Sequence, residues 1–212
     1  MKAMEKDLYQ HSTYVPKIDF SFHQYLIPGE EPILVHTGYA DQTRALLPRM
    51  EEVLGGRELA YIFPSHFEGD ECGGLALLME RYPAAVVVCS AVTARQIAGF
   101  GCGAATRVQK PGDRLLSPSF ELEFFSYPSE MHLWEGLLAL ERKRSVFFSA
   151  DLMIRPGEGG GKVRESRWED EVHGIGPEQV PDPERRSRLQ RELREISPVF
   201  VATGHGPCVR LH

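Results

Sequence analysis

A short apolar run that leads directly into acidic and histidine side chains is the feature that most restricts the fold of this chain. Residues 61–63, Tyr-Ile-Phe, are typical of a buried strand, and they run directly into the polar stretch 63–74. Imidazole and carboxylate groups that follow a strand at alternating positions can turn toward one point, and both ligate metals once deprotonated. These donors suit iron, manganese or zinc, whereas a solvated acidic loop is the alternative interpretation. The candidate ligands in this stretch are His66, Glu68, Asp70 and Glu71.

Composition is that of an ordinary globular protein. The 212 residues suit a single domain, 1–212, and the 42% hydrophobic and 25% charged residues exclude a disordered chain. A net charge of -6 gives no basic surface for nucleic acid or an anionic membrane. The sequence shows no signal peptide and no stretch long enough to span a bilayer, and its four cysteines form no C-x-x-C pair. We therefore expect a cytoplasmic protein with reduced thiols and with no nucleic-acid or membrane partner.

The first half of the chain alternates strands and helices. Its first two strands form a hairpin, so part of the sheet is antiparallel, and the later β-α-β-α alternation implies parallel strands joined by crossovers. Residues 1–18 are polar and are expected to be irregular, and the glycine-rich segment 99–104 is expected to be a turn. The expected strands are 20–27, 33–35, 61–63 and 85–89, and the expected helices are 43–54, 75–79 and 91–98.

The second half is dominated by short strands. A polar, glycine-rich segment, 155–181, is expected to be a mobile loop long enough to form a lid over a site. Asp182 is an N-cap for an amphipathic helix that precedes a last strand, 199–202. Two successive blocks of strands and helices predict an α/β fold, a four-layer αβ/βα sandwich with two mixed sheets face to face and helices outside. The other expected strands are 114–116, 122–127, 136–140 and 145–149.

Three further candidate ligands stand where predicted strands end. His132 follows the strand 122–127, Asp151 follows 145–149, and His205 follows 199–202. Ligands at the ends of several strands converge on one edge of a sheet, where a metal site can be held rigidly. Together with the cluster at 66–71 they predict a metal site.

These residues resemble the metallo-β-lactamase fold and, within it, the di-iron, oxygen-binding domain of the flavodiiron proteins, over residues 22–205. The usual hydrolase motif of that fold is His-x-His-x-Asp-His, whereas the flavodiiron version is His-x-Glu-x-Asp-His. This chain reads His-Phe-Glu-Gly-Asp-Glu from His66, so Glu68 is the residue that separates the two subfamilies. Trp134 and Glu135, after His132, stand close to where that family has Trp and Asp. The resemblance implies that one metal is held by His66, Glu68 and His132 and the other by Asp70 and His205, with Asp151 bridging them.

The chain departs from the flavodiiron pattern at two positions. Glu71 replaces the histidine that ordinarily ligates the second metal, so it either serves as an oxygen ligand or leaves that position open. His36 stands where the family more often has Asp, at a position that orients the ligand loops, and we expect a structural role for it. His173, in the expected lid, is a weaker substitute for the missing ligand.

The donor set is rich in oxygen, which is typical of non-haem di-iron sites that handle dioxygen. We therefore expect two metal ions, iron first and zinc or manganese as alternatives, in a protein that binds, senses or reduces dioxygen or nitric oxide. The alternative is a dinuclear metallohydrolase whose small-molecule substrate is a phosphoester or thioester, and a third interpretation is an inert metal-bound module. Flavodiiron proteins carry a flavodoxin domain, which we do not expect in this chain, so the resemblance implies a separate electron-transfer protein or a sensor. It also implies a homodimer.

Overall fold

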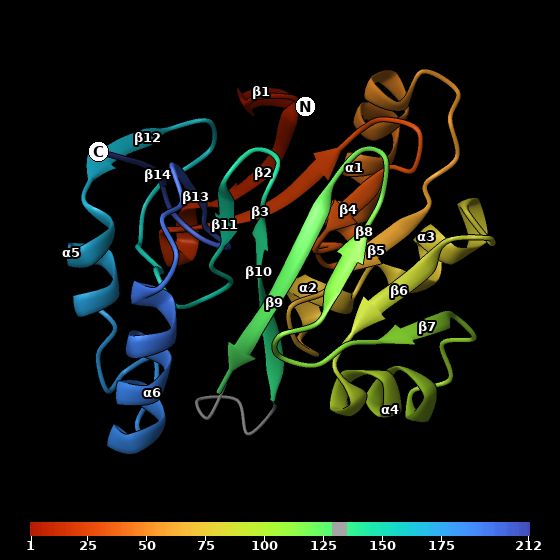
Figure 1. Cartoon of the computed structure of the whole chain (residues 1–212). Helices are drawn as coiled ribbons and strands as arrows, with labels where there is room; N and C mark the ends of the chain where they lie inside the picture. Colours follow the sequence, from red (N-terminus) through yellow and green to blue (C-terminus); the bar gives the residue numbers. More distant parts are fainter. Residues whose placement is uncertain (129–134) are drawn as a thin grey trace.

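Two seven-stranded mixed sheets pack face to face in the computed structural model, which describes residues 1–128 and 135–212 (Figure 1). The first sheet follows chain order from β1 to β7, antiparallel from β1 to β4 and parallel from β4 to β7. Its parallel half is the β-α-β part that the sequence predicts. Its strands are β1 Lys2–Glu5, β2 Leu8–Val15, β3 Phe20–Ile27, β4 Ile33–Val35, β5 Tyr61–Phe63, β6 Val86–Cys89 and β7 Ala105–Val108.

The second sheet has the order β12-β14-β13-β11-β10-β9-β8. Only its β11–β13 and β12–β14 pairs are parallel. The parallel β11–β13 pair is the one that matters for the site, because both strands then end at the same edge. The strands are β8 Arg114–Leu116, β9 Glu121–Tyr127, β10 Gly136–Glu141, β11 Val146–Phe148, β12 Val163–Ser166, β13 Phe200–Ala202 and β14 Cys208–Leu211.

The main core lies between the sheets, and helices cover their outer faces. Side chains of both sheets, among them Phe63 and Phe124 with ring centroids 5.4 Å apart, form one buried cluster. A second cluster joins the first sheet to its helices, and a third joins the second sheet to α5 and α6. Figure 1 shows α5 and α6 on the outer side of the second sheet. The predicted α/β sandwich is thus confirmed. The helices are α1 Ala40–Leu54, α2 Gly69–Cys72, α3 Leu75–Arg81, α4 Ala91–Gly99, α5 Trp168–His173 and α6 Pro183–Arg194, with a 3-10 turn at Pro16–Ile18.

Two segments that we expected to be irregular contain regular structure. Residues 1–18 include the hairpin β1–β2, which extends the sheet because β2 pairs with β3 over seven residues. Residues 155–181 are not a continuous loop, since they contain β12 and α5. The polar composition of both segments misled the prediction, because backbone pairing to a neighbouring strand outweighs weak β-propensity. The expected lid is therefore in part an edge strand and an outer helix.

The described helices are all too short or too polar to cross a membrane. All four cysteines are free thiols.

Candidate metal centre

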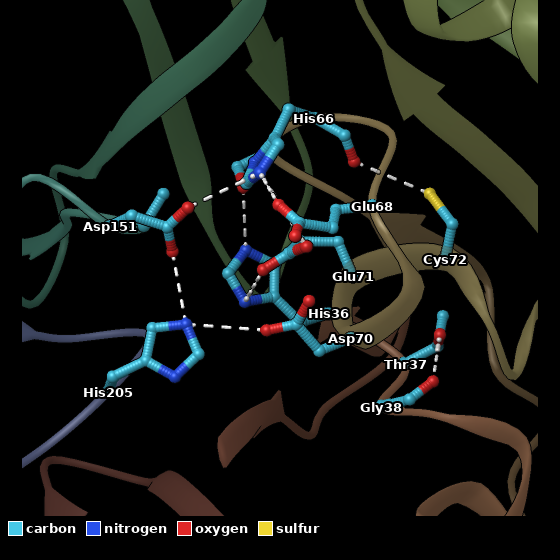
Figure 2. A network of polar contacts seen from close by, with 12 residues as sticks. His36, Thr37, Gly38, His66, Glu68, Asp70, Glu71, Cys72, Asp151 and His205 are labelled. Carbon is cyan, nitrogen blue, oxygen red and sulfur yellow. Dashed lines mark hydrogen bonds and ion pairs between the residues drawn. The ribbon is translucent and has the colours of Figure 1, made fainter. Parts of the chain in front are cut away.

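The candidate ligands come from both sheets and meet at one edge of the sandwich. His66 and the acidic residues after it follow β5 of the first sheet, whereas Asp151 and His205 follow β11 and β13 of the second. Figure 2 shows the carboxylates of the 66–71 loop turned toward the space beside His66, Asp151 and His205. The prediction that strand-end residues converge is confirmed for these elements. His132 lies outside the described residues.

His66 lies at the centre of the first half of the site. Its Nε2 atom is 3.2 Å from Glu68 Oε2, 3.3 Å from Asp151 Oδ2 and 3.7 Å from Glu71 Oε2. The imidazole is fully buried and its ring packs edge-on against Tyr127, with centroids 5.3 Å apart. Three carboxylates thus surround one imidazole nitrogen, an arrangement that suits a cation between them.

His205 lies at the centre of the second half of the site, where its imidazole is likewise surrounded by carboxylates. Its Nε2 atom is 3.1 Å from Asp151 Oδ1 and 3.3 Å from Asp70 Oδ2, while Nδ1 lies 2.9 Å from the carbonyl oxygen of Ser21. Because that carbonyl can only accept, Nδ1 carries the proton and Nε2 is directed at the carboxylates. Burial lowers the pKa of His205, but the hydrogen bond and charge of Asp151 and the charge of Asp70 outweigh it and raise the pKa.

Asp70 and Glu71 are crowded and buried. Burial raises the pKa of Asp70, although the charge of His205 partly offsets this. Burial, with the charges of Asp70 and Asp151, raises the pKa of Glu71 well above its usual range. Glu71 Oε2 is buried and makes no hydrogen bond with the described residues. Such an atom needs a partner, and a metal ion would supply one, so the residues present fit a metal centre.

The loop that carries the acidic ligands is fastened to the segment before α1. The backbone amides of Thr37 and Gly38 donate to the carbonyl oxygens of Glu71 and Asp70, at 3.0 and 2.8 Å. At the first residue of α2, a Cβ on Gly69 would lie 2.6 Å from Cε1 of Tyr39, so only glycine lets the ring lie this close. These contacts fix the backbone positions of Asp70 and Glu71.

His36 lies behind the ligands and touches them through one serine. Its Nε2 atom is 2.9 Å from Ser65 Oγ, which is itself 3.0 Å from His66 Nδ1. Its Nδ1 atom is 3.9 Å from Glu71 Oε1. Burial lowers the pKa of His36 to about 3, so the ring is neutral. The structural role that the sequence predicts for His36 agrees with these contacts.

Sequence reasoning missed Tyr127 and misjudged His173. The Tyr127 hydroxyl donates to Asp151 Oδ2 at 3.3 Å, and the only signal for it is its place at the end of β9. His173 belongs to α5 and lines a groove with Arg167 and Arg194 in the outer layer. The prediction that His173 could substitute for the missing ligand is therefore wrong.

Comparison with known proteins places these observations in a family context. The sequence model described as ODP family beta lactamase matches residues 20–171. A putative diflavin flavoprotein A 1 from Thermosynechococcus vestitus is 28% identical over 203 residues, which are 91% of this chain and 34% of the relative. A putative diflavin flavoprotein A 2 from Nostoc is 24% identical over 204 residues. The chain thus spans about a third of the length of these curated relatives.

Solved structures with the same fold include flavodiiron proteins. A metal-soaked flavodiiron core from Synechocystis has a TM-score of 0.80 at 20% identity, covering 98% of this chain and 56% of that one. The flavodiiron protein from Giardia intestinalis has a TM-score of 0.76 at 17% identity, covering 96% and 54%. A metallo-beta-lactamase from Pontibacter korlensis has a TM-score of 0.72 at 18% identity, covering 99% and 92%. At these identities the likeness establishes the fold.

Proposed function

Because this chain belongs to the family described as ODP family beta lactamase, we propose that it is a dinuclear metal protein that binds, senses or reduces dioxygen or nitric oxide. One observation carries the proposal: buried carboxylates from two sheets converge on two histidines. In the part of the chain that the structure describes, the ion-pair partners of Asp70 and Glu71 are histidines and not lysine or arginine. Without such a cation, the cluster needs metal to balance its charge.

The proposed ligand assignment follows the two halves of the site. His66, Glu68 and His132 would hold one metal, and Asp70 and His205 would hold the other. Asp151 lies between them, because its two carboxylate oxygens face Nε2 of His66 and Nε2 of His205. The Tyr127 hydroxyl orients Asp151, and the ring of Phe20 stacks on His205 with centroids 4.5 Å apart. These neighbours hold the ligands in place and keep water from their outer sides.

Iron is the proposed metal, with manganese and zinc as the alternatives. With Glu71 included, the candidate ligands are four carboxylates and three imidazoles, and an oxygen-rich donor set favours iron or manganese over zinc. Iron, when bound, supplies one-electron redox chemistry and open coordination positions for a diatomic ligand. The names of the matched relatives, diflavin flavoproteins, favour this redox interpretation over a phosphoester or thioester hydrolase.

The partners of the protein are also proposals. Reduction needs electrons, which we propose come from an electron-transfer protein; the relatives' name, diflavin flavoprotein, is consistent with a flavin donor. A homodimer, a cytoplasmic location and a single domain over residues 1–212 remain predictions of the sequence.

Metal analysis followed by gas exposure tests the proposal. The protein is purified from cells given both iron and zinc, its metals are counted, and it is reduced without air before oxygen or nitric oxide is admitted. We expect about two iron atoms per chain and an optical change on addition of either gas. Two zinc atoms with no optical change would instead support the hydrolase. Bound iron that responds to neither gas would indicate the inert module.

A further inference from the structure

Among the residues that the structure describes, Glu71 is the acidic residue shared by both candidate metal-binding groups. One group is His66, Glu71 and Asp151, and the other is Asp70, Glu71 and His205; within each, the ligand atoms lie within 4.8 Å of one another. Figure 2 shows its carboxylate beside those of Glu68 and Asp70, on the inner side of the loop. A side chain with one donor atom could serve only one of these groups. A carboxylate has two oxygens and can serve both.

A chain of hydrogen bonds directs an N–H group at Glu71. When His66 binds metal through Nε2, its proton is on Nδ1, which donates to Ser65 Oγ at 3.0 Å. The Ser65 hydroxyl then donates to His36 Nε2 at 2.9 Å. The proton of His36 is consequently on Nδ1, the atom 3.9 Å from Glu71 Oε1. This tautomer is assigned from the hydrogen-bond partners.

The two oxygens of Glu71 therefore differ in their surroundings. Oε1 lies 3.9 Å from His36 Nδ1, close enough for electrostatic attraction but too far for a hydrogen bond. Oε2 is buried, 3.7 Å from His66 Nε2, and makes no hydrogen bond with the described residues. An aspartate in place of His36 would put a second carboxylate against Oε1 and repel it. The two departures from the flavodiiron pattern, at 36 and 71, thus compensate each other.

We propose that Glu71 is a second carboxylate bridge between the two metal positions, beside Asp151, and that His36 is its positioning residue. The proposal rests on the proposed dinuclear centre. A second bridging carboxylate adds a hard oxygen ligand to both positions. It therefore favours iron or manganese over zinc at both.

Manganese titration of the metal-free protein tests the bridge. Mn²⁺ is added to the wild type, to Glu71→Gln and to a control, Glu68→Gln, which removes a ligand of one position only. Metals per chain are counted, and electron paramagnetic resonance reports spin coupling between neighbouring ions. We expect Glu71→Gln to weaken both positions by about tenfold or more and to change the coupling, and Glu68→Gln to weaken one position.

The outcomes separate the bridge from the proposed function. A wild type that binds no metal would overturn both. Two coupled ions in the wild type, with unchanged affinity and coupling in Glu71→Gln, would overturn the bridge and leave the dinuclear centre standing. Weakening of a single position in Glu71→Gln would make Glu71 a terminal ligand and would also overturn it.

A double-mutant cycle tests His36. Its backbone has φ of +62°, a conformation that Asp and Asn tolerate, so His36→Asp and His36→Asn should fold without added strain. With Glu71 unchanged, we expect His36→Asp to lower manganese affinity by about tenfold and His36→Asn to lower it by less. In the Glu71→His background, His36→Asp should have a much smaller effect. Equal losses in both backgrounds would show that His36 does not act through Glu71.

Discussion

Asp151 presents one carboxylate oxygen to each histidine of the centre: Oδ2 lies 3.3 Å from His66 Nε2, and Oδ1 lies 3.1 Å from His205 Nε2. The two histidines belong to loops from different sheets, so one short side chain spans the junction between them. This relationship makes Asp151 the residue on which both proposed metal positions would depend, and the first prediction follows from it.

Asp151→Ala should lose both metals. The substitution removes the only side chain in contact with both Nε2 atoms among the described residues, whereas Tyr127→Phe, the matched control, removes a hydroxyl that touches Asp151. Metals per chain, measured after dialysis, are expected to fall to near zero in the first variant and to fall by less in the second. Retention of both metals by Asp151→Ala would contradict its bridging role.

Glu71→Gln should stabilise the metal-free protein at neutral and higher pH. Burial raises the pKa of Glu71 well above its usual value of 4.5, so this carboxyl binds more protons in the folded state than in the unfolded state. Its contribution to stability is full below pH 4.5 and is lost as pH rises through the folded-state pKa. Urea unfolding in a chelator should show the variant gaining about 1–3 kcal/mol over wild type at pH 8 and little at pH 4. A gain that is independent of pH would point to packing instead.

His23→Gln should make the protein less sensitive to acid. His23 Nε2 lies 2.7 Å from the carbonyl oxygen of Gly206, and burial lowers the pKa of His23 from 6.5 to about 4. Between pH 6.5 and 4 the unfolded chain protonates His23 and the folded chain does not. The stability that the neutral, buried His23 contributes is therefore present above pH 6.5 and is lost as pH falls toward 4. Over that window wild type should lose about 3 kcal/mol relative to the variant. Parallel pH profiles in urea unfolding would show that His23 does not titrate in this way.

Gly69→Ala should destabilise the ligand loop through one contact. A Cβ at this position would lie 2.6 Å from Tyr39 Cε1, and the φ angle of Gly69 is not in the left-handed region, so backbone strain contributes nothing. Because Tyr39 is 41% exposed and its ring can move aside, we expect a loss of about 1 kcal/mol in unfolding free energy, together with weaker metal binding. In the Tyr39→Ala background the same substitution should be neutral or slightly stabilising. An equal loss in both backgrounds would place the cause elsewhere.

The strand-end residues could be predicted from sequence because short, wholly apolar runs such as 61–63 and 146–148 are poor helix formers and end abruptly in polar residues. The contacts of Tyr127 and the hydrogen-bond chain through Ser65 could not be predicted, since they depend on how the folded chain packs. The hairpin β1–β2 was missed for a related reason: the polar side chain of Gln10 is buried, and its amide donates to Tyr25 on the next strand at 3.1 Å. A pattern of polar residues does not reveal a partner that is distant in sequence.

The ligands of the centre are divided between the two sheets: Asp70 and Glu71 come from the first half of the chain, and Asp151 and His205 from the second. Neither half alone brings together a complete set, so tight metal binding requires that both have formed and docked. Metal loading of the proposed centre would then be a late event in folding, and it would act as a check on assembly. A chain whose sheets have docked out of register would remain metal-free, which makes metal content per chain a direct measure of the correctly assembled fraction.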